Sequence, residues 1–334
     1  MYSYPAYFNQ QLATIAPSYP YLDSTPVNFK GESVDSLQKP VDSVETSASD
    51  NIQKTNKKGM SKGLKWLLGI IGTGASIYGC VVGHRVLSKP SFETVQKNLS
   101  EILGKDLSKE EAEKILSKYR GICNESSMEE YLNKLFKEVK KDCGYEDLDL
   151  VLKIEKLKDG SFQTFNEHSV NGGAGCVNKE ITLYPRTSNN SLSRKDRRTL
   201  FGTTWHEFKH VKQNEQAYRA DSKALIDAYV QRLEKNHPEF IEEMMKENKC
   251  SREDALKDIY EEIGNNLESL FGKYEKYAIG SPEYEKGLKY IENELNYVKD
   301  GPEYYTQLVE KEAHEIGDKA RPIFDYLANP FKIF

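Results

Sequence analysis

The sequence predicts an α+β fold in which helices dominate and a small sheet is inserted ahead of a central helix. Three observations predict this. Amphipathic segments with serine caps follow one another from Pro90 onward. Two segments, 148–157 and 176–185, alternate apolar and polar residues as strands do. Beyond Ser193 the pattern is almost wholly helical.

Composition narrows the class of protein. The chain has 334 residues, of which 38% are hydrophobic and 30% are charged, so a polytopic membrane protein is excluded. Its 47 basic residues are outnumbered by 52 acidic ones, which gives a net charge of −5. Because nucleic-acid binding usually leaves a basic excess, we expect no nucleic-acid partner.

Residues 1–63 are predicted to form a disordered N-terminal arm. Five of the 12 prolines lie in the first 50 residues, and no apolar period of 3.6 or 2 is present there. The Tyr/Pro-rich start, from Tyr2 to Tyr21, has the composition of a short docking motif. We interpret it as a tether without a catalytic part.

Residues 64–88 are predicted to form a single transmembrane helix. The run from Trp66 to His84 is 19 residues without a charge, and at about 1.5 Å per residue it matches the ~30 Å hydrocarbon core. Lysines concentrate on its N-terminal side, which predicts a single-pass membrane protein with a cytoplasmic N-terminus. Gly79 and Gly83 have the GxxxG spacing that permits self-association. The alternative is a glycine-rich helix buried in a soluble domain.

Residues 90–334 are predicted to form the folded domain, and cap residues mark its helices. Ser91, Ser108, Ser127, Ser251 and Ser281 are expected to begin helices, and Gly104, Gly121 and Gly144 to end them. The segment 171–175 (Asn-Gly-Gly-Ala-Gly) lacks a Walker lysine and a GxGxxG pattern, so we expect a turn.

The informative motif is His206-Glu207-Phe208-Lys209-His210, an uninterrupted HExxH. In a helix the two histidines lie one turn apart on the same face, where both imidazoles reach one Zn²⁺. Glu207 lies beside that face, where its carboxylate accepts a proton from metal-bound water. A separate apolar stripe that includes Leu200 and Val211 is expected to pack the helix on the core.

A catalytic zinc site requires a third protein ligand. Gln213 and Gln216 occupy the positions where metzincins have Gly and His, so that class is excluded. An acidic residue on a later helix is the natural alternative, and residues 304–318 (YYTQLVEKEAHEIGD) offer several.

The HExxH helix and this later acidic helix resemble the gluzincin zinc metallopeptidases, whose third ligand is a Glu in an ExxA or ExxxD pattern. The resemblance covers roughly residues 165–320, and only HExxH is specific within it. It implies a zincin-like domain in which His206, His210 and Glu310 bind Zn²⁺ and Glu207 is catalytic. His314 stands where several gluzincins have Asp. Glu312, Glu315 and His314 remain alternatives to Glu310 as the third ligand.

The same resemblance implies a peptide or protein substrate, which would add as a strand beside the predicted edge strand 176–185. The helices between 222 and 298 would be an insertion that covers the cleft. Gln213, one turn beyond His210, could hydrogen-bond a ligand or a connecting loop, since zinc-bound imidazoles usually need an outer partner, or it could be an ordinary surface glutamine. Tyr304, Tyr305 and His168 are candidate donors for transition-state stabilisation.

The sequence therefore predicts a membrane-tethered zinc endopeptidase. The alternative is a non-catalytic, membrane-anchored helical adaptor whose HExxH is a structural or vestigial metal site. If the domain lies outside the cytoplasm, four cysteines (Cys123, Cys143, Cys176 and Cys250) could form two disulfides in three connectivities.

Overall fold

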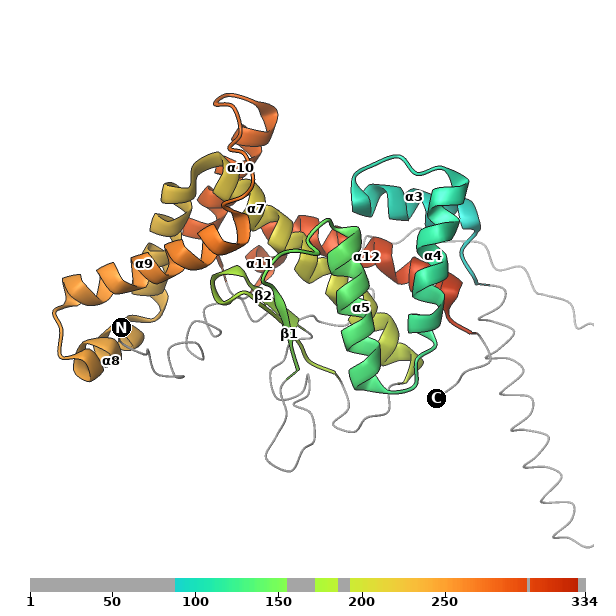
Figure 1. Ribbon diagram of the computed structural model, residues 1–334, viewed down its shortest axis with the longest axis horizontal. Coiled ribbons are helices and arrows are strands. Elements are labelled where there is room, and N and C mark those ends of the chain that lie inside the picture. The colour runs from blue at the N-terminus through green and yellow to red at the C-terminus, as the bar shows by residue number, and fades with distance from the viewer. Residues whose placement is uncertain (1–87, 155–171, 186–192, 299–300, 330–334) are drawn as a thin grey trace, which may run out of the picture. The chain divides into compact units, whose positions relative to one another are not determined.

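The computed structural model describes residues 88–154, 172–185, 193–298 and 301–329 (Figure 1). The described chain is α+β, as predicted, with many helices and one small sheet. The predicted arm 1–63 and, except for Ser88, the predicted span 64–88 lie outside the described residues. Within the described ranges, none of the helices combines the length and the apolarity that a membrane crossing requires.

Three helices precede the sheet: α3 (Phe92–Leu103), α4 (Lys109–Cys123) and α5 (Met128–Asp142). Each begins as predicted, where a serine side chain accepts a hydrogen bond from a backbone N–H of the first turn. Gly104 ends α3 with a φ of 67°, and Gly144 follows α5 with a φ of 78°. The predicted end at Gly121 is wrong, because α4 continues to Cys123 and the glycine is accommodated on its exposed face.

The sheet contains β1 (Val151–Lys153), β2 (Gly172–Gly175) and β3 (Glu180–Leu183) in the order β1-β3-β2. Strand β1 is parallel to β3, and β2 is antiparallel to it. The two predicted strands are therefore shorter than expected, and residues Cys176–Asn178 form a 3-10 turn.

The turn predicted at 171–175 is wrong, because residues 172–175 form strand β2. Glycine adopts extended backbone as readily as turn conformations, and here the ladder of hydrogen bonds to β3 decides between them. The edge strands of this sheet are consequently β1 and β2, while the segment predicted to be the edge supplies the central strand β3.

The central helix is α7 (Arg194–Asn236), which begins at a capping box between Ser193 and Asp196. Its helical backbone is interrupted at Asp221, where φ is −149° and ψ is 97°. The Asp221 side chain accepts a hydrogen bond from the N–H of Ala224 at 2.9 Å, so it caps the second helical segment as an N-cap residue does. The predicted apolar stripe, including Leu200 and Val211, is buried.

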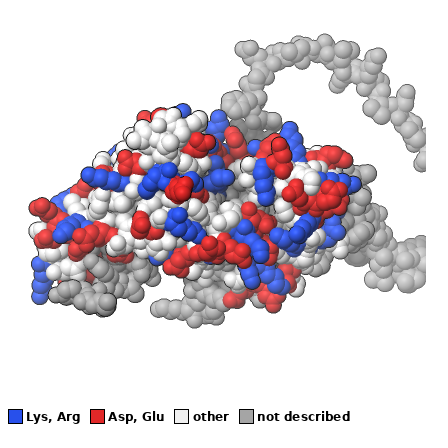
Figure 2. All heavy atoms as spheres, turned by 45° about the horizontal axis from the view of Figure 1, so that its top comes forward, with Lys and Arg blue, Asp and Glu red and all other residues white. Residues whose placement is uncertain are grey.

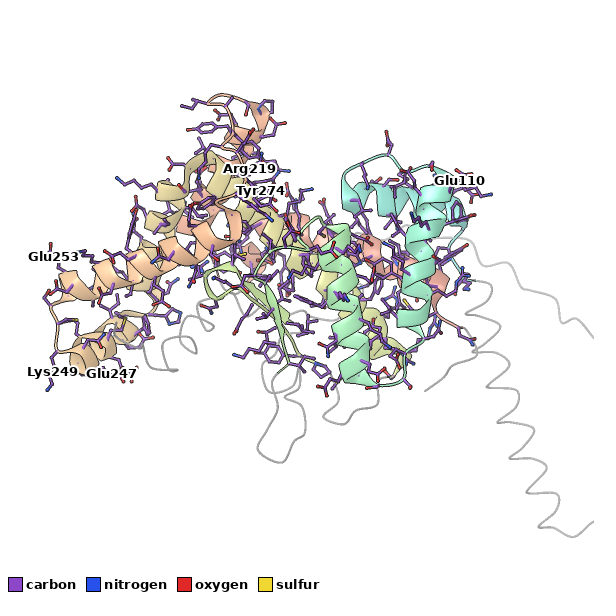
Figure 3. All side chains as sticks on the ribbon, viewed as in Figure 1. Glu110, Arg219, Glu247, Lys249, Glu253 and Tyr274 are labelled. Carbon is purple, nitrogen blue, oxygen red and sulfur yellow. The ribbon has the colours of Figure 1, made fainter. Side chains whose placement is uncertain are left out.

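Arg219, which lies just before the break, holds the segment that follows α9. The guanidinium of Arg219 lies 4.1 Å from the ring centre of Tyr277 and 5.9 Å from that of Tyr274, which Figure 3 shows beside it. The Arg219 side chain also donates a hydrogen bond of 2.8 Å to the carbonyl of Glu275. These cation–π and hydrogen-bond contacts tie the segment after α9 to the end of the motif helix.

The remaining helices are α8 (Pro238–Asn248), α9 (Arg252–Phe271), α10 (Pro282–Leu295), α11 (Pro302–Thr306) and α12 (Leu308–Leu327). Helices α9 and α10 begin at Ser251 and Ser281, as predicted. Helices α10 and α12 make the most extensive contacts with α7 (Figure 1). The site described below is built between these three helices and β2.

Glycines allow these helices to approach α7 closely. A Cβ on Gly287 of α10 would lie 2.5 Å from the Cβ of Ala220 and 2.6 Å from the carbonyl oxygen of Gln216. At the crossing of α12, a Cβ on Gly317 would lie 3.2 Å from the carbonyl oxygen of Gly202. The absence of side chains at these positions therefore sets how near α10 and α12 can lie to α7.

Charges of both signs alternate over the face drawn in Figure 2. Many belong to ion pairs on the surface, such as that between Lys134 and Glu125 at 2.6 Å. Exposed pairs of this kind contribute little to stability, typically below about 1 kcal/mol. The four cysteines that could have formed two disulfides are free thiols in this structure.

The close approach of α10 generates a stability prediction. Replacing Gly287 by Ala should destabilise the full chain by about 1–3 kcal/mol, because the new methyl group overlaps a backbone carbonyl that cannot move without shifting α7. The matched control is Gly121→Ala, where a Cβ meets nothing within 4 Å. That change should be neutral or stabilise by up to about 1 kcal/mol. Urea unfolding measures both, and equal effects would contradict the packing argument.

Candidate metal centre

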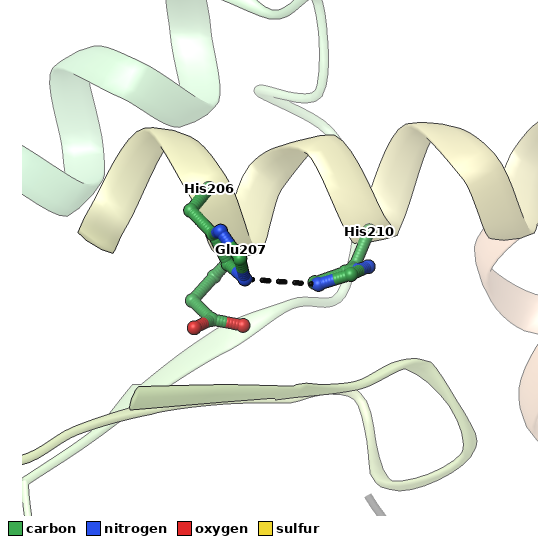
Figure 4. Close-up of side chains that lie close together, drawn as sticks. All are labelled: His206, Glu207 and His210. Atoms are coloured by element: carbon green, nitrogen blue, oxygen red, sulfur yellow. Dashed lines mark hydrogen bonds between the residues drawn. The ribbon is translucent and has the colours of Figure 1, made fainter. Parts of the chain in front are cut away.

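The predicted site residues His206, Glu207 and His210 extend from one side of α7 toward the sheet (Figure 4). The Nε2 atoms of His206 and His210 lie 3.1 Å apart. Ligand atoms of these two histidines and of Glu207 all lie within 4.8 Å of one another. The three residues are 2%, 4% and 1% exposed, respectively. The helix therefore presents the motif to a nearly dry interior.

Glu310 meets the same two histidines from the first turn of α12. Its Oε2 lies 3.7 Å from Nε2 of His206, and its Oε1 lies 3.6 Å from Nε2 of His210. The Glu310 side chain is fully buried. The structure thus brings together the four side chains that the sequence selected, although 100 residues separate His210 from Glu310.

The spacing of these atoms fits a shared cation. A tetrahedral ion about 2.1 Å from each ligand atom keeps the ligand atoms about 3.4 Å apart. The two imidazole nitrogens are 3.1 Å apart here, and the two oxygens of Glu310 lie 3.6 Å from one and 3.7 Å from the other, which is near that value. The two imidazoles and one carboxylate therefore have the geometry of a three-ligand metal site, and the set of donor atoms is one that zinc accepts.

The alternative third ligands are placed differently. Glu312 forms ion pairs with Lys209 at 2.8 Å and Lys286 at 3.2 Å. Two lysines therefore already balance its negative charge. Glu315 is exposed. The ring of His314 packs edge-on against His206, with 4.7 Å between ring centres. Of the three glutamates considered on α12, only Glu310 lies between the two histidines.

His210 has a hydrogen-bond partner on the side away from Glu310. Nδ1 of His210 lies 2.9 Å from Oε1 of Gln213, and the Gln213 amide donates to the carbonyl of Val309 at 3.0 Å. The structure thus contains the predicted hydrogen bond of Gln213 to the ring of His210. This outer contact fixes the orientation of the His210 ring and leaves its Nε2 for a metal.

Two tyrosines hold the Glu310 carboxylate. Tyr304 donates to Oε2 at 2.7 Å and Tyr297 donates to Oε1 at 3.2 Å. Tyr304 was predicted to stabilise a transition state, but its hydroxyl serves Glu310 in this structure. Tyr305 packs against Tyr304 with 4.9 Å between ring centres, and His168 lies outside the described residues.

Sequence reasoning missed Tyr297. It follows the end of α10, and it is one of 21 tyrosines with no spacing that links it to the motif. An amphipathic helix places many tyrosines against a core, so only the packing of α10 beside α12 distinguishes this one.

Burial shapes the protonation of the site. Burial lowers the pKa of His206 well below its usual value, and the neighbouring His210 and His314 lower it further. A neutral imidazole is the form that binds a metal. For His210 burial also lowers the pKa, but the Glu310 carboxylate more than offsets this, so the pKa is raised.

Glu207 is set apart from the other carboxylates. Burial raises its pKa to about 8, and the charge of Glu310 acts in the same direction, while His210 and a hydrogen bond from the Ala174 backbone oppose it. Its Oε2 has no hydrogen-bond partner in the described part of the chain. A buried carboxylate with one uncommitted oxygen is suited to accept and return a proton.

The raised pKa of Glu207 generates a prediction for the protein kept metal-free with a chelator. Because the folded pKa, about 8, exceeds that of the unfolded chain, the protonated form is stabilised on folding and this contribution is lost as pH rises toward 8. Denaturant unfolding between pH 5 and pH 8 should therefore show a steeper loss of stability for wild type than for Glu207→Gln. Parallel curves would contradict the assignment.

No family model, curated protein or solved structure matches this chain. What the centre does is therefore inferred from its own geometry and chemistry. Those are two imidazoles with a carboxylate close to both, together with an adjacent buried carboxyl group whose Oε2 has no hydrogen-bond partner among the described residues.

Proposed function

We propose that this chain is a zinc-dependent peptidase of gluzincin type. The observation that supports the proposal is that the Glu310 carboxylate approaches both imidazoles of the HExxH motif, with one oxygen 3.7 Å from His206 and the other 3.6 Å from His210. Zn²⁺ bound there would lower the pKa of a water ligand toward ~7 and polarise a substrate carbonyl. His206, His210 and Glu310 would hold the ion and leave one position open.

Glu207 acts as general base and then as general acid. It lies beside the ligands rather than on the far side of the helix, and its unpaired Oε2 has no competing hydrogen bond in the described structure. A cation at the centre would lower its pKa below the metal-free value, which favours the carboxylate that takes the proton. Returning the proton to the leaving amine completes peptide hydrolysis.

Strand β2 offers the substrate a backbone edge. It is hydrogen-bonded to β3 on one side and contacts α7 beside the centre. Its Gly-Gly-Ala-Gly sequence presents almost no side chain, which lets another backbone approach closely. An extended peptide that pairs with this edge would carry its carbonyl past the histidines, so the proposed substrate is a peptide or an unfolded protein segment.

The predicted span 64–88 would anchor this domain to a membrane with the N-terminus in the cytoplasm. Fractionation of cells that express the full chain, or the chain without residues 64–88, tests this part separately. Recovery of the full chain in the soluble fraction would contradict the anchor and leave the peptidase proposal standing.

The first prediction from the proposed function concerns metal binding. The full chain should bind one Zn²⁺, and Glu310→Gln should weaken binding at least about tenfold, because a carboxylate ligand is replaced by a poorly donating amide. Glu315→Gln, an exposed glutamate on the same helix, is the matched control and should bind like wild type. Metal competition with a chromophoric chelator measures the affinities. Equal weakening in both variants would exclude Glu310 as a specific ligand.

The second prediction concerns catalysis. Glu207→Gln should keep the zinc affinity within a few-fold and lower kcat about 10²–10⁴-fold, because the amide cannot take the proton. Hydrolysis of an unstructured protein such as casein provides the assay. Wild-type rates in this variant would refute the mechanism. A wild-type chain that binds zinc and hydrolyses no peptide would instead favour the structural metal site of an adaptor.

The third prediction concerns the tyrosines on Glu310. Tyr297→Phe removes one hydrogen bond from Oε1 and should weaken zinc binding about 10- to 100-fold, the usual effect of losing an outer contact. Tyr326→Phe, on a partly buried tyrosine elsewhere on α12, is the control and should leave the affinity unchanged. A null result for Tyr297→Phe would show that Tyr304 alone orients the carboxylate.

A further inference from the structure

A partly open pocket adjoins the metal centre on the His210 side. Its wall includes Asn214, from α7 before the break at Asp221, and Leu225 and Tyr229, from α7 after it. Helix α10 contributes Glu294. The change of direction at Asp221 therefore creates the pocket, because a straight α7 could not place its two segments around one hollow.

The hydrogen-bond donors of the pocket wall are already committed to protein partners. Tyr229 donates to Asn214, and Tyr290 donates to Glu312 at 2.6 Å. Tyr297 donates to Glu310 at 3.2 Å. The Asn214 amide donates to the His210 carbonyl at 3.0 Å. What the wall offers an incoming group is therefore mostly acceptor oxygen.

Glu294 is the one carboxylate among the residues that line this pocket. Its buried Oε1 forms an ion pair with Arg232 and accepts no hydrogen bond from another described residue. Arg232 is 5% exposed, and its guanidinium lies over the rings of Tyr229 at 5.2 Å and Tyr297 at 5.3 Å. This packing holds the carboxylate in place at the wall of the pocket.

We infer that this pocket receives a substrate side chain that ends in a positively charged hydrogen-bond donor, lysine or arginine. Glu294 is the specificity-determining residue. The inference rests on the proposed peptidase function and names the substrate class of the same site. The aliphatic stem packs against Leu225 and Val309, and the terminal nitrogen donates to the Glu294 carboxylate.

The same wall rejects acidic side chains. A substrate carboxylate would lose its hydration beside Glu294 and find no uncommitted donor among the lining groups described above. An uncharged side chain of equal length loses only the charge-assisted hydrogen bond. That difference corresponds to a preference of about tenfold or more for the charged side chain.

The test uses the full chain loaded with Zn²⁺ and a peptide library in which each position near the cleaved bond is varied. At one position, kcat/KM should be at least about tenfold higher for lysine than for norleucine, which has a similar stem without the ammonium. Glu294→Gln should bring this ratio close to one. Glu292→Gln, an exposed glutamate on the same helix, is the matched control and should keep the wild-type ratio.

Glu294→Gln leaves Arg232 without its buried partner, so the variant could fail to fold. The double variant Arg232→Gln/Glu294→Gln removes both charges and should also abolish the preference for lysine. Cleavage by wild type without preference for lysine or arginine at any position would overturn this inference and leave the peptidase standing. Absence of all cleavage would overturn the proposed function, and this inference with it.

Discussion

The site depends on the close crossing of α12 over α7, where Gly317 faces the backbone of Gly202. A larger residue at either position would push the helices apart, and the Glu310 carboxylate would move away from the histidines. The crossing is thus the geometric constraint from which the spacing of 3.6–3.7 Å between Glu310 and the two imidazoles follows. Helices pack as rigid bodies, so one contact between small residues can position a side chain two turns away.

Burying a carboxylate beside two imidazoles is unfavourable unless each polar atom has a partner. The described structure provides partners for Glu310 and His210: Tyr304 and Tyr297 donate to Glu310, and Gln213 connects His210 to the backbone of α12. This network links three helices through the centre itself. Zinc bound at this point would tie α7 to α12 more strongly, so metal affinity and the stability of the folded chain should be coupled.

Much of the fold and of the candidate site could be predicted from the sequence alone. Serine caps marked the starts of α3, α4 and α9 because capping is a local interaction between a side chain and the next turn. The HExxH pattern selected His206, Glu207 and His210 because helical periodicity fixes which residues share a face. Strand β2 was missed because glycine has no strong local preference, and pairing with β3 is a long-range interaction.

The sequence by itself determined the motif helix, the glutamate proposed to accept a proton and a short set of carboxylates for the proposed third ligand. Only the tertiary structure shows which of Glu310, Glu312 and Glu315 lies beside the histidines, because all three lie on α12 and each meets a different neighbour. It also shows that Tyr297 contacts Glu310, that Glu294 lines the pocket, and that α7 breaks at Asp221. Contacts between residues far apart in the chain leave no periodic trace in the sequence, because they are set by how whole helices pack.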